Sequence, residues 1–288
     1  MTSDTEKSIE KRILAIYEEI PPGERALADL IMDQRSDFIG YTATELAKQA
    51  NVSKATAARL FKRLGYRSFE EARRVARQVN HWGSPLKQLE ARGEARVAPN
   101  VLEHLATDQE NLRKTFDRIT ADQMEQSLDI LSKGQTIWIL GLRNSYGLAH
   151  YARFILNMLR EDVRLIPIGG LSFAEEVLNM KPGDGMLVIG FRRRPMALRA
   201  VMSKAQSLGV KTVYVTDISA ARTAKLADVV FRCHSHGPYL YDSYTAAVSI
   251  LNFLGTSLAL HLGQTGIDRL NQIDELHDEL DAFSHSKR

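Results

Sequence analysis

The sequence contains a single cysteine, Cys233, among its 288 residues. One thiol cannot form a disulfide within the chain, so the composition gives no reason to expect an oxidising compartment. The first residues, MTSDTEKSIEKR, lack the apolar run of a secretory signal peptide. We therefore expect a cytoplasmic protein.

Long uninterrupted hydrophobic runs are also missing. The most apolar stretch, residues 250–262, is broken by polar residues and glycine, namely Asn252, Gly255, Thr256, Ser257 and His261. It falls short of a bilayer span, which needs about 20 predominantly apolar residues. We expect a buried helix here and no membrane partner.

The net charge of +3 is too small to indicate a partner, but the charge is unevenly distributed. Residues 48–77 carry nine lysines and arginines against two glutamates. A local basic excess on helical residues is typical of a nucleic-acid contact. A solvated helix face without any ligand is the alternative explanation.

The chain is long enough for two domains, although a single globule is also possible. Helical periodicity without strand-like runs extends to about residue 136, so the first part is predicted to be all-α. A helix over residues 8–20 should end at Pro21-Pro22-Gly23, and a second helix should follow with Leu27, Leu30 and Ile31 on one face. We expect an N-terminal domain over residues 1–80, a linker over 81–100 and connecting helices over 101–135.

From residue 136 the pattern changes to short β-rich runs that alternate with helical segments. The runs cover residues 136–140, 163–168, 186–191, 211–216 and 228–233. Nearly continuous apolar strands separated by helices indicate a parallel sheet that is covered on both faces. We therefore predict a three-layer α/β domain with five parallel strands over residues 136–288.

Two helices are expected to close this domain. The first is apolar and begins at about Tyr241, and the second covers residues 267–283. An apolar stripe on the second helix is predicted to serve docking or dimerisation, and it consists of Leu270, Ile273, Leu276, Leu280 and Phe283.

The most specific motif is TATELAKQANVSKATAARLFKRLGY, residues 42–66. Thr42 and Glu45 have the spacing of a capping box, which sets the start of a helix. Asn51 stands where the chain must turn sharply, and asparagine tolerates a left-handed backbone. Ser53 can then cap the next helix. The pattern predicts two short helices joined by a tight turn.

The second of these helices has a buried and an open face. Ala57, Leu60, Phe61 and Leu64 recur at helical spacing and should be buried. Two short helices with a basic free side have the geometry that enters a DNA major groove, and an ordinary helical hairpin is the alternative. The predicted DNA contacts are Thr42, Ser53, Lys54, Thr56, Arg59, Lys62 and Arg63.

Residues 52–71, VSKATAARLFKRLGYRSFEE, resemble the signature of the RpiR-type (MurR/RpiR) regulators. The matching positions are Val52, Ser53, Thr56, Arg59, Leu64, Gly65, Tyr66 and Phe69. The resemblance implies a transcriptional regulator that binds double-stranded DNA. It also implies a C-terminal SIS domain, a sugar-isomerase-like parallel α/β fold with strand order 2-1-3-4-5.

With that strand order, the order of the strands reverses between the first and third strands, and ligands of open α/β sheets bind at such a point. The loops there are GLRNS, residues 141–145, and GFRRRP, residues 190–195. Each loop precedes a helix whose positive end favours anions, and guanidinium groups suit phosphate and carboxylate. The predicted anion contacts are Gly141, Arg143, Asn144, Ser145, Arg192, Arg193, Arg194 and Ser219.

The loops depart from the family pattern. SIS domains that bind phosphosugars usually have Gly-x-Gly-x-Ser after the first strand and Ser-x-Ser-Gly-x-Thr after the third. This chain has Arg143 for the second glycine and FRRRP in the second loop. The effector is thus expected to be a phosphorylated sugar or sugar acid, with another anion as the alternative. Some of the arginines can instead be structural, paired with Asp217 or Asp242.

An isomerase with an accessory DNA-binding domain is the competing function. Isomerisation needs a positioned carboxylate or histidine base, and the sequence places none, so a non-enzyme is predicted. A nicotinamide enzyme is less favoured, because the first loop lacks the glycines of G-x-G-x-x-G. Cys233, His234 and His236 form the only metal-like cluster, and zinc needs three or four ligands. No metal or cofactor is expected.

The predicted assembly is a homodimer or homotetramer on a palindromic operator. A lone helix-turn-helix buries little surface, and two-fold symmetry lets two copies read half-sites separated by about 34 Å.

Overall fold

The computed structural model describes residues 9–33, 42–79, 100–168, 173–192, 194–220 and 223–285. Contacts divide the chain into two compact units. The first comprises Met1–Pro99, Ser219–Arg222 and Tyr239–Tyr241, and the second comprises Asn100–Ile218, Thr223–Pro238 and Asp242–Arg288.

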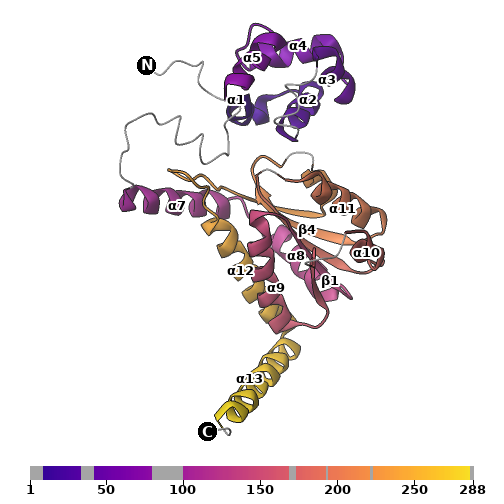
Figure 1. Ribbon diagram of the computed structural model, residues 1–288, viewed down its shortest axis with the longest axis vertical. Helices are drawn as coiled ribbons and strands as arrows, with labels where there is room; N and C mark the ends of the chain where they lie inside the picture. The colour runs from indigo at the N-terminus through magenta and orange to yellow at the C-terminus, as the bar shows by residue number, and fades with distance from the viewer. Residues whose placement is uncertain are drawn as a thin grey trace. The chain divides into compact units, whose positions relative to one another are not determined.

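The first unit is helical in its described part (Figure 1). Its elements are α1 (Ile9–Ala15), the 3-10 helix η2 (Tyr17–Glu19), α2 (Pro22–Asp33), α3 (Ala43–Gln49), α4 (Lys54–Arg63) and α5 (Phe69–Val79). They enclose one apolar core that includes Ile13, Leu27, Leu46 and Leu60, each 0% exposed. The all-α prediction for this part is confirmed.

The predicted helix over residues 8–20 is wrong at its C-terminal end. α1 ends at Ala15, and Tyr17–Glu19 form a 3-10 turn. Such a turn commonly closes a helix, and the two prolines that follow disfavour a continued α-helix. In this arrangement the Tyr17 hydroxyl donates a hydrogen bond of 2.5 Å to the Asp29 carboxylate.

The second unit contains a parallel sheet with strand order β2-β1-β3-β4-β5, as the resemblance implied. The strands are β1 (Ile137–Gly141), β2 (Val163–Ile166), β3 (Gly185–Gly190), β4 (Lys211–Asp217) and β5 (Val229–Cys233). All five predicted runs form strands. β2 stops two residues before the predicted end, because Pro167 has no backbone N–H to donate to the ladder.

Helices cover both faces of this sheet (Figure 1). Their bounds are α7 (Val101–Phe116), α8 (Ala121–Lys133), α9 (Asn144–Leu159), α10 (Phe173–Leu178), α11 (Met196–Ser207), the 3-10 helix η4 (Thr223–Leu226), α12 (Thr245–Leu262) and α13 (Gln264–His285). Ile139, Leu187 and Val213 face a core shared with α8, α9 and α12. The predicted three-layer α/β fold is confirmed.

Helix α12 has the length and composition of a membrane-crossing helix, the only such helix in the described ranges. However, Ile250, Leu254 and Leu258 are at most 2% exposed and pack into the core under the sheet. α12 is therefore a core helix of the α/β unit, as its polar interruptions predict.

Candidate functional site

The helix-turn-helix begins with the predicted capping box. The Thr42 hydroxyl accepts a hydrogen bond from the Glu45 amide at 3.3 Å, and the Thr42 amide donates to the Glu45 carboxylate at 2.7 Å. The bond from the Thr42 backbone is the main reason why the pKa of Glu45 lies below its ordinary value. Asn51 has φ 53°, so the predicted left-handed turn is also confirmed.

Helix α4 starts and ends at specific residues. The Ser53 hydroxyl accepts a hydrogen bond from the Thr56 amide at 3.0 Å, which caps the first turn. Gly65 follows the helix with φ 83°, and a side chain there would approach the Arg12 guanidinium to 2.8 Å. That guanidinium donates a hydrogen bond to the Leu64 carbonyl. Both ends of α4 are therefore held in place.

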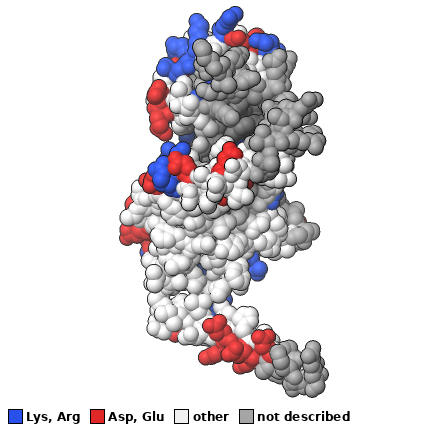
Figure 2. Space-filling model, turned by 90° about the vertical axis from the view of Figure 1, so that its left-hand side faces the viewer, with Lys and Arg blue, Asp and Glu red and all other residues white. Residues whose placement is uncertain are grey.

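Between these ends, α4 buries Ala57, Leu60 and Phe61 and leaves a basic side open. Figure 2 shows lysine and arginine gathered on the helical unit that contains α4 and α5. Lys54 and Lys62 are exposed, and no hydrogen bond or ion pair joins either of them to another described residue. Their ammonium groups are thus available to an external anion.

Two arginines of α4 have an internal partner that the sequence did not reveal. Glu24 of α2 has a side chain that is only 5% exposed, and it accepts a hydrogen bond of 2.9 Å from Arg63. Arg59 lies 3.7 Å from the same carboxylate and donates a hydrogen bond to the Thr56 hydroxyl. The bond to Glu24 raises the pKa of Arg63. Arg63 is therefore oriented by α2, whereas Arg59, 64% exposed, remains largely open to solvent.

The two predicted effector loops lie side by side at the carboxyl ends of β1 and β3. The Ser145 hydroxyl accepts a hydrogen bond of 3.2 Å from the Phe191 amide and so joins the loops. The Ser145 amide donates to the Leu142 carbonyl within its own loop. Gly141 is required at the end of β1, because a side chain would meet the Ser145 carbonyl oxygen at 2.5 Å.

Arg194 is a structural residue rather than an open cation. Its guanidinium is 8% exposed and lies 2.8 Å from the Asp217 carboxylate, at the end of β4. It also donates to the Gly190 carbonyl, the Tyr214 hydroxyl and the Thr216 hydroxyl. Burial lowers the pKa of Arg194, but Asp217 and Tyr214 outweigh that effect and raise it. Arg194 therefore stays charged inside the domain.

Arg192 also forms an ion pair, with the carboxylate of Asp242 at 3.0 Å, and its side chain is 11% exposed. The Arg192 amide donates a hydrogen bond to Asp217. The alternative that arginines of this loop pair with Asp217 or Asp242 is thus confirmed for Arg192 and Arg194. The charges of Arg192 and Arg194 therefore do not add to a free positive potential beside the two loops.

The remaining predicted effector contacts lie in different parts of the chain and differ in exposure. Arg143 and Asn144 are exposed at the start of α9. Ser219 is 3% exposed and belongs to the compact unit of the N-terminal residues. Arg193 lies outside the described residues.

Tyr244 is a neighbour of these loops that the sequence analysis missed. Its ring packs edge-on against Phe191 with 5.1 Å between centroids. Burial raises the pKa of the Tyr244 hydroxyl, and a hydrogen bond to Asn144 partly offsets this. Tyr244 immediately precedes α12, and no local spacing in the sequence connects it to the loops.

The described residues contain no group of three or more His, Cys, Asp or Glu side chains placed to hold a metal ion. Cys233 is 1% exposed, and burial raises the pKa of its thiol. Cys233 is therefore a core side chain at the end of β5.

Arg143 has a backbone conformation that favours glycine, with φ 55° and ψ −127°. A non-glycine residue in such a region costs about 1–3 kcal/mol. We expect Arg143→Gly to stabilise the α/β unit by about 1 kcal/mol, after the entropy cost of glycine, which corresponds to roughly 2–4 °C in Tm. Thermal unfolding followed by circular dichroism measures this. Arg143→Ala is the matched control, since it removes the side chain and keeps the strain, and an equal gain in that variant would contradict the explanation.

Comparison with known proteins gives two family matches. The model of a helix-turn-helix domain of the rpiR family matches residues 7–78, and the model of the SIS domain matches residues 130–257. YbbH of Bacillus subtilis, described as an uncharacterised HTH-type transcriptional regulator, is 25% identical over 243 residues, which are 82% of this chain and 83% of YbbH.

Solved structures show the same fold. The NanR protein of Vibrio vulnificus, solved with ManNAc-6P, is 17% identical with a TM-score of 0.58 and covers 94% of this chain and 98% of its own. The sugar isomerase domain of an RpiR transcription factor from Sphaerobacter thermophilus is 22% identical with a TM-score of 0.57. It covers 60% of this chain and 97% of its own.

Proposed function

Since the chain belongs to the RpiR-type family, which joins a helix-turn-helix domain to a SIS domain, we propose that a small anionic effector controls its binding to DNA. The chain is a DNA-binding transcriptional regulator. The observation that carries the proposal is the open basic side of α4, held by caps at both ends, in the same chain as a sugar-isomerase-like sheet. We place the DNA-reading domain at residues 1–80 and the sensor at residues 136–288.

The proposed DNA contacts are those on or beside α4. Lys54 and Lys62 would bind phosphates, and Arg59 would contact a base or a phosphate from mid-helix. Arg63 would act chiefly by holding α4 against α2 through Glu24, because its guanidinium is already bonded. Thr42, Ser53 and Thr56 would contribute hydroxyl contacts at the helix starts.

The proposed effector is a phosphorylated sugar or sugar acid. The complex with ManNAc-6P of NanR, a protein of the same fold, supports this class. The pairing of Arg192 and Arg194 with carboxylates favours an effector with one anionic group and several hydroxyls over a polyanion. Arg143, Asn144 and the Ser145 hydroxyl would contact it, with Arg193 as a further candidate, while Gly141, Arg192 and Arg194 would shape the crevice.

We propose that the chain is not an enzyme. A sugar isomerase needs a carboxylate or histidine free to move a proton. Beside the second loop, the carboxylates of Asp217 and Asp242 are both held by arginine. An assay of hexose-phosphate turnover by the whole chain, with product detected by chromatography, would overturn this proposal if conversion exceeded the uncatalysed rate.

The proposal that an effector controls DNA binding is tested with the whole chain and with an operator selected from a random DNA library. Thermal shift against a set of hexose 6-phosphates and sugar acids identifies an effector, because a ligand that binds only the folded state raises Tm. That effector should change operator affinity by about 5–150-fold, and the operator should change effector affinity by the same factor. The proposal would be contradicted if every compound that raises Tm left the operator affinity unchanged.

Ser145→Ala should weaken effector binding measured by calorimetry. The variant removes the hydroxyl that joins the loops at Phe191. The loss of one hydrogen bond to a charged group is worth about 1.5–3 kcal/mol, or roughly 10–150-fold in Kd. Ser207→Ala on α11 is a matched control, since its hydroxyl bonds only within that helix in the described structure. Equal affinity of all three proteins would place the effector elsewhere.

The proposed assembly is a cytoplasmic homodimer or homotetramer on a palindromic operator. Symmetric pairing lets two α4 helices read two half-sites at once. Light scattering of the chain alone and with operator tests this form.

A further inference from the structure

The second half of helix α13 extends away from the other elements of the α/β unit. The first turns of α13 pack beside α9, where Arg269 donates two hydrogen bonds to the Asn157 carbonyl at 3.2 and 3.1 Å and Leu270 joins the edge of the core. From residue 274 to residue 281 every side chain is exposed. Figure 1 shows this part extending beyond the sheet. We call residues 274–281 the α13 arm.

The charge pattern of the α13 arm disfavours a helical conformation when the arm has no packing partner. It holds five carboxylates, Asp274, Glu275, Asp278, Glu279 and Asp281, and no lysine or arginine. Like charges four residues apart cost about 0.2–0.5 kcal/mol for each pair, and carboxylates near a helix C-terminus oppose its dipole. An isolated helix of this length is marginal in water. A surface with cations and apolar groups would stabilise it.

The arm also carries apolar side chains toward solvent. Leu276 is 53% exposed and Leu280 is 57% exposed. Together with Ile273 they have the spacing of one helix face, at intervals of three and four residues. The arm therefore combines an apolar stripe with a dense negative charge, and Figure 2 shows acidic side chains gathered along it.

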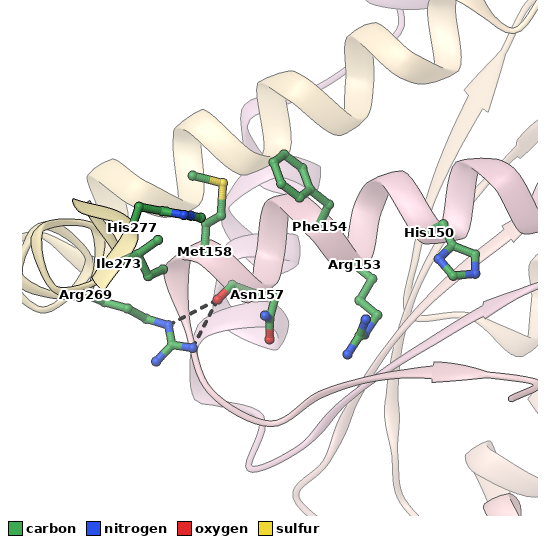
Figure 3. Close-up of a pocket in the computed structure, with 8 residues that line it drawn as sticks. All are labelled: His150, Arg153, Phe154, Asn157, Met158, Arg269, Ile273 and His277. Carbon is green, nitrogen blue, oxygen red and sulfur yellow. Dashed lines mark hydrogen bonds between the residues drawn. The ribbon is translucent and has the colours of Figure 1, made fainter. Parts of the chain in front are cut away.

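A groove of complementary character lies between α9 and α13, with a volume of about 380 Å³, and its wall on α13 extends to His277 at the base of the arm. Its lining combines polar and apolar side chains with two arginines and consists of His150, Arg153, Phe154, Asn157, Met158, Arg269, Ile273 and His277 (Figure 3). Arg269 lies 3.7 Å from the Glu161 carboxylate, so Arg153 supplies most of the unpaired positive charge. Phe154 is 63% exposed at its edge. We call it the α9 groove.

We propose that the α9 groove of one copy receives the α13 arm of a second copy, so that two identical contacts form. The arm of the same chain cannot fill the groove, because α13 is one continuous helix whose Ile273 and His277 already form its wall. Since groove and arm belong to one chain, a two-fold axis generates both contacts at once. Direct pairing of two arms would bring their carboxylates together, which charge repulsion opposes. This inference rests on the proposed homo-oligomer and specifies its surface.

Charge reversal tests the contact in the full chain by sedimentation velocity over a concentration series. Arg153→Glu changes the groove, and the double variant Glu275→Lys/Glu279→Lys changes the arm. Each alone should weaken the dimer by at least about tenfold, as expected when like charges face each other in an interface. An equimolar mixture of the two should regain wild-type affinity, because every groove in the mixed dimer then meets an arm of opposite charge.

Leu276→Ser/Leu280→Ser should dissociate the dimer without unfolding the chain, since both side chains are exposed. Leu178→Ser is the matched control, because Leu178 is 84% exposed on α10 and outside the groove. Hydrogen exchange is a second readout: arm amides should be protected in wild type and exchange rapidly in the serine variant. Circular dichroism melting confirms that each variant folds.

The outcomes separate this inference from the proposed assembly. A wild-type chain that stays monomeric at all concentrations overturns both. A wild-type dimer that keeps its affinity and arm protection in every variant overturns only the surface. A tighter dimer in Glu275→Lys/Glu279→Lys indicates pairing of arm with arm and also overturns it.

Discussion

Asp217→Asn is expected to destabilise the α/β unit by about 3–5 kcal/mol, because it leaves the buried Arg194 guanidinium without its counter-charge. The two side chains are 8% and 7% exposed and lie 2.8 Å apart. Asp217 also accepts the Arg192 amide at 2.6 Å, so the same carboxylate holds the loop after β3. For a domain of this size the expected drop in Tm is roughly 6–20 °C.

Urea unfolding followed by circular dichroism measures the free energy of unfolding. Lys211→Ala is the control on the same strand, since the Lys211 ion pair with Asp228 is exposed and should contribute at most about 1 kcal/mol. Replacing both partners, as Asp217→Leu/Arg194→Met, should cost less than Asp217→Asn alone, because no buried charge is then left unpaired. If Asp217→Asn unfolds at the same urea concentration as Lys211→Ala, the pair does not hold the loop.

Arg59→Ala/Lys62→Ala should reduce operator affinity by at least tenfold and lower its dependence on salt. Each lost phosphate contact decreases the slope of log K against log salt by about 1, and a lost base contact costs about 1–3 kcal/mol. Both side chains are exposed on α4, so neither substitution should disturb the core. Fluorescence anisotropy at several salt concentrations, with the operator and with unrelated DNA, separates the two effects.

Lys204→Ala is the control for loss of a surface cation outside the helix-turn-helix. An unchanged affinity and slope in Arg59→Ala/Lys62→Ala would show that α4 does not read DNA. Equal loss for operator and unrelated DNA would assign Arg59, like Lys62, to a phosphate, whereas a larger loss for the operator than for unrelated DNA would assign Arg59 to a base.

Local features of this chain could be predicted from neighbouring residues. The capping box of Thr42 and Glu45, the left-handed Asn51 and the strand-forming runs depend on interactions over a few positions, and all three are present. The end of α1 could not be predicted in the same way, because helical periodicity continues past Ala15 while the backbone tightens before two prolines.

The charges at the two predicted effector loops could not be predicted from the sequence. The run of arginines at 192–194 by itself suggests a strongly positive pocket. In the fold, the parallel register places Gly190 opposite Thr216, so that Asp217 lies beside the same loop and neutralises Arg194. Asp242, 50 residues away in the chain, does the same for Arg192.

The sequence by itself determined the two domain types, the strand-forming segments, the caps of α3 and α4 and the family, because these depend on local spacing and periodicity. Only the tertiary structure decided which charges remain available: Glu24 engages Arg63 across 39 residues, and Asp217 and Asp242 engage two of the predicted effector residues. The physical reason is that an ion pair depends on distance in space and on burial, and strand register and helix packing set both.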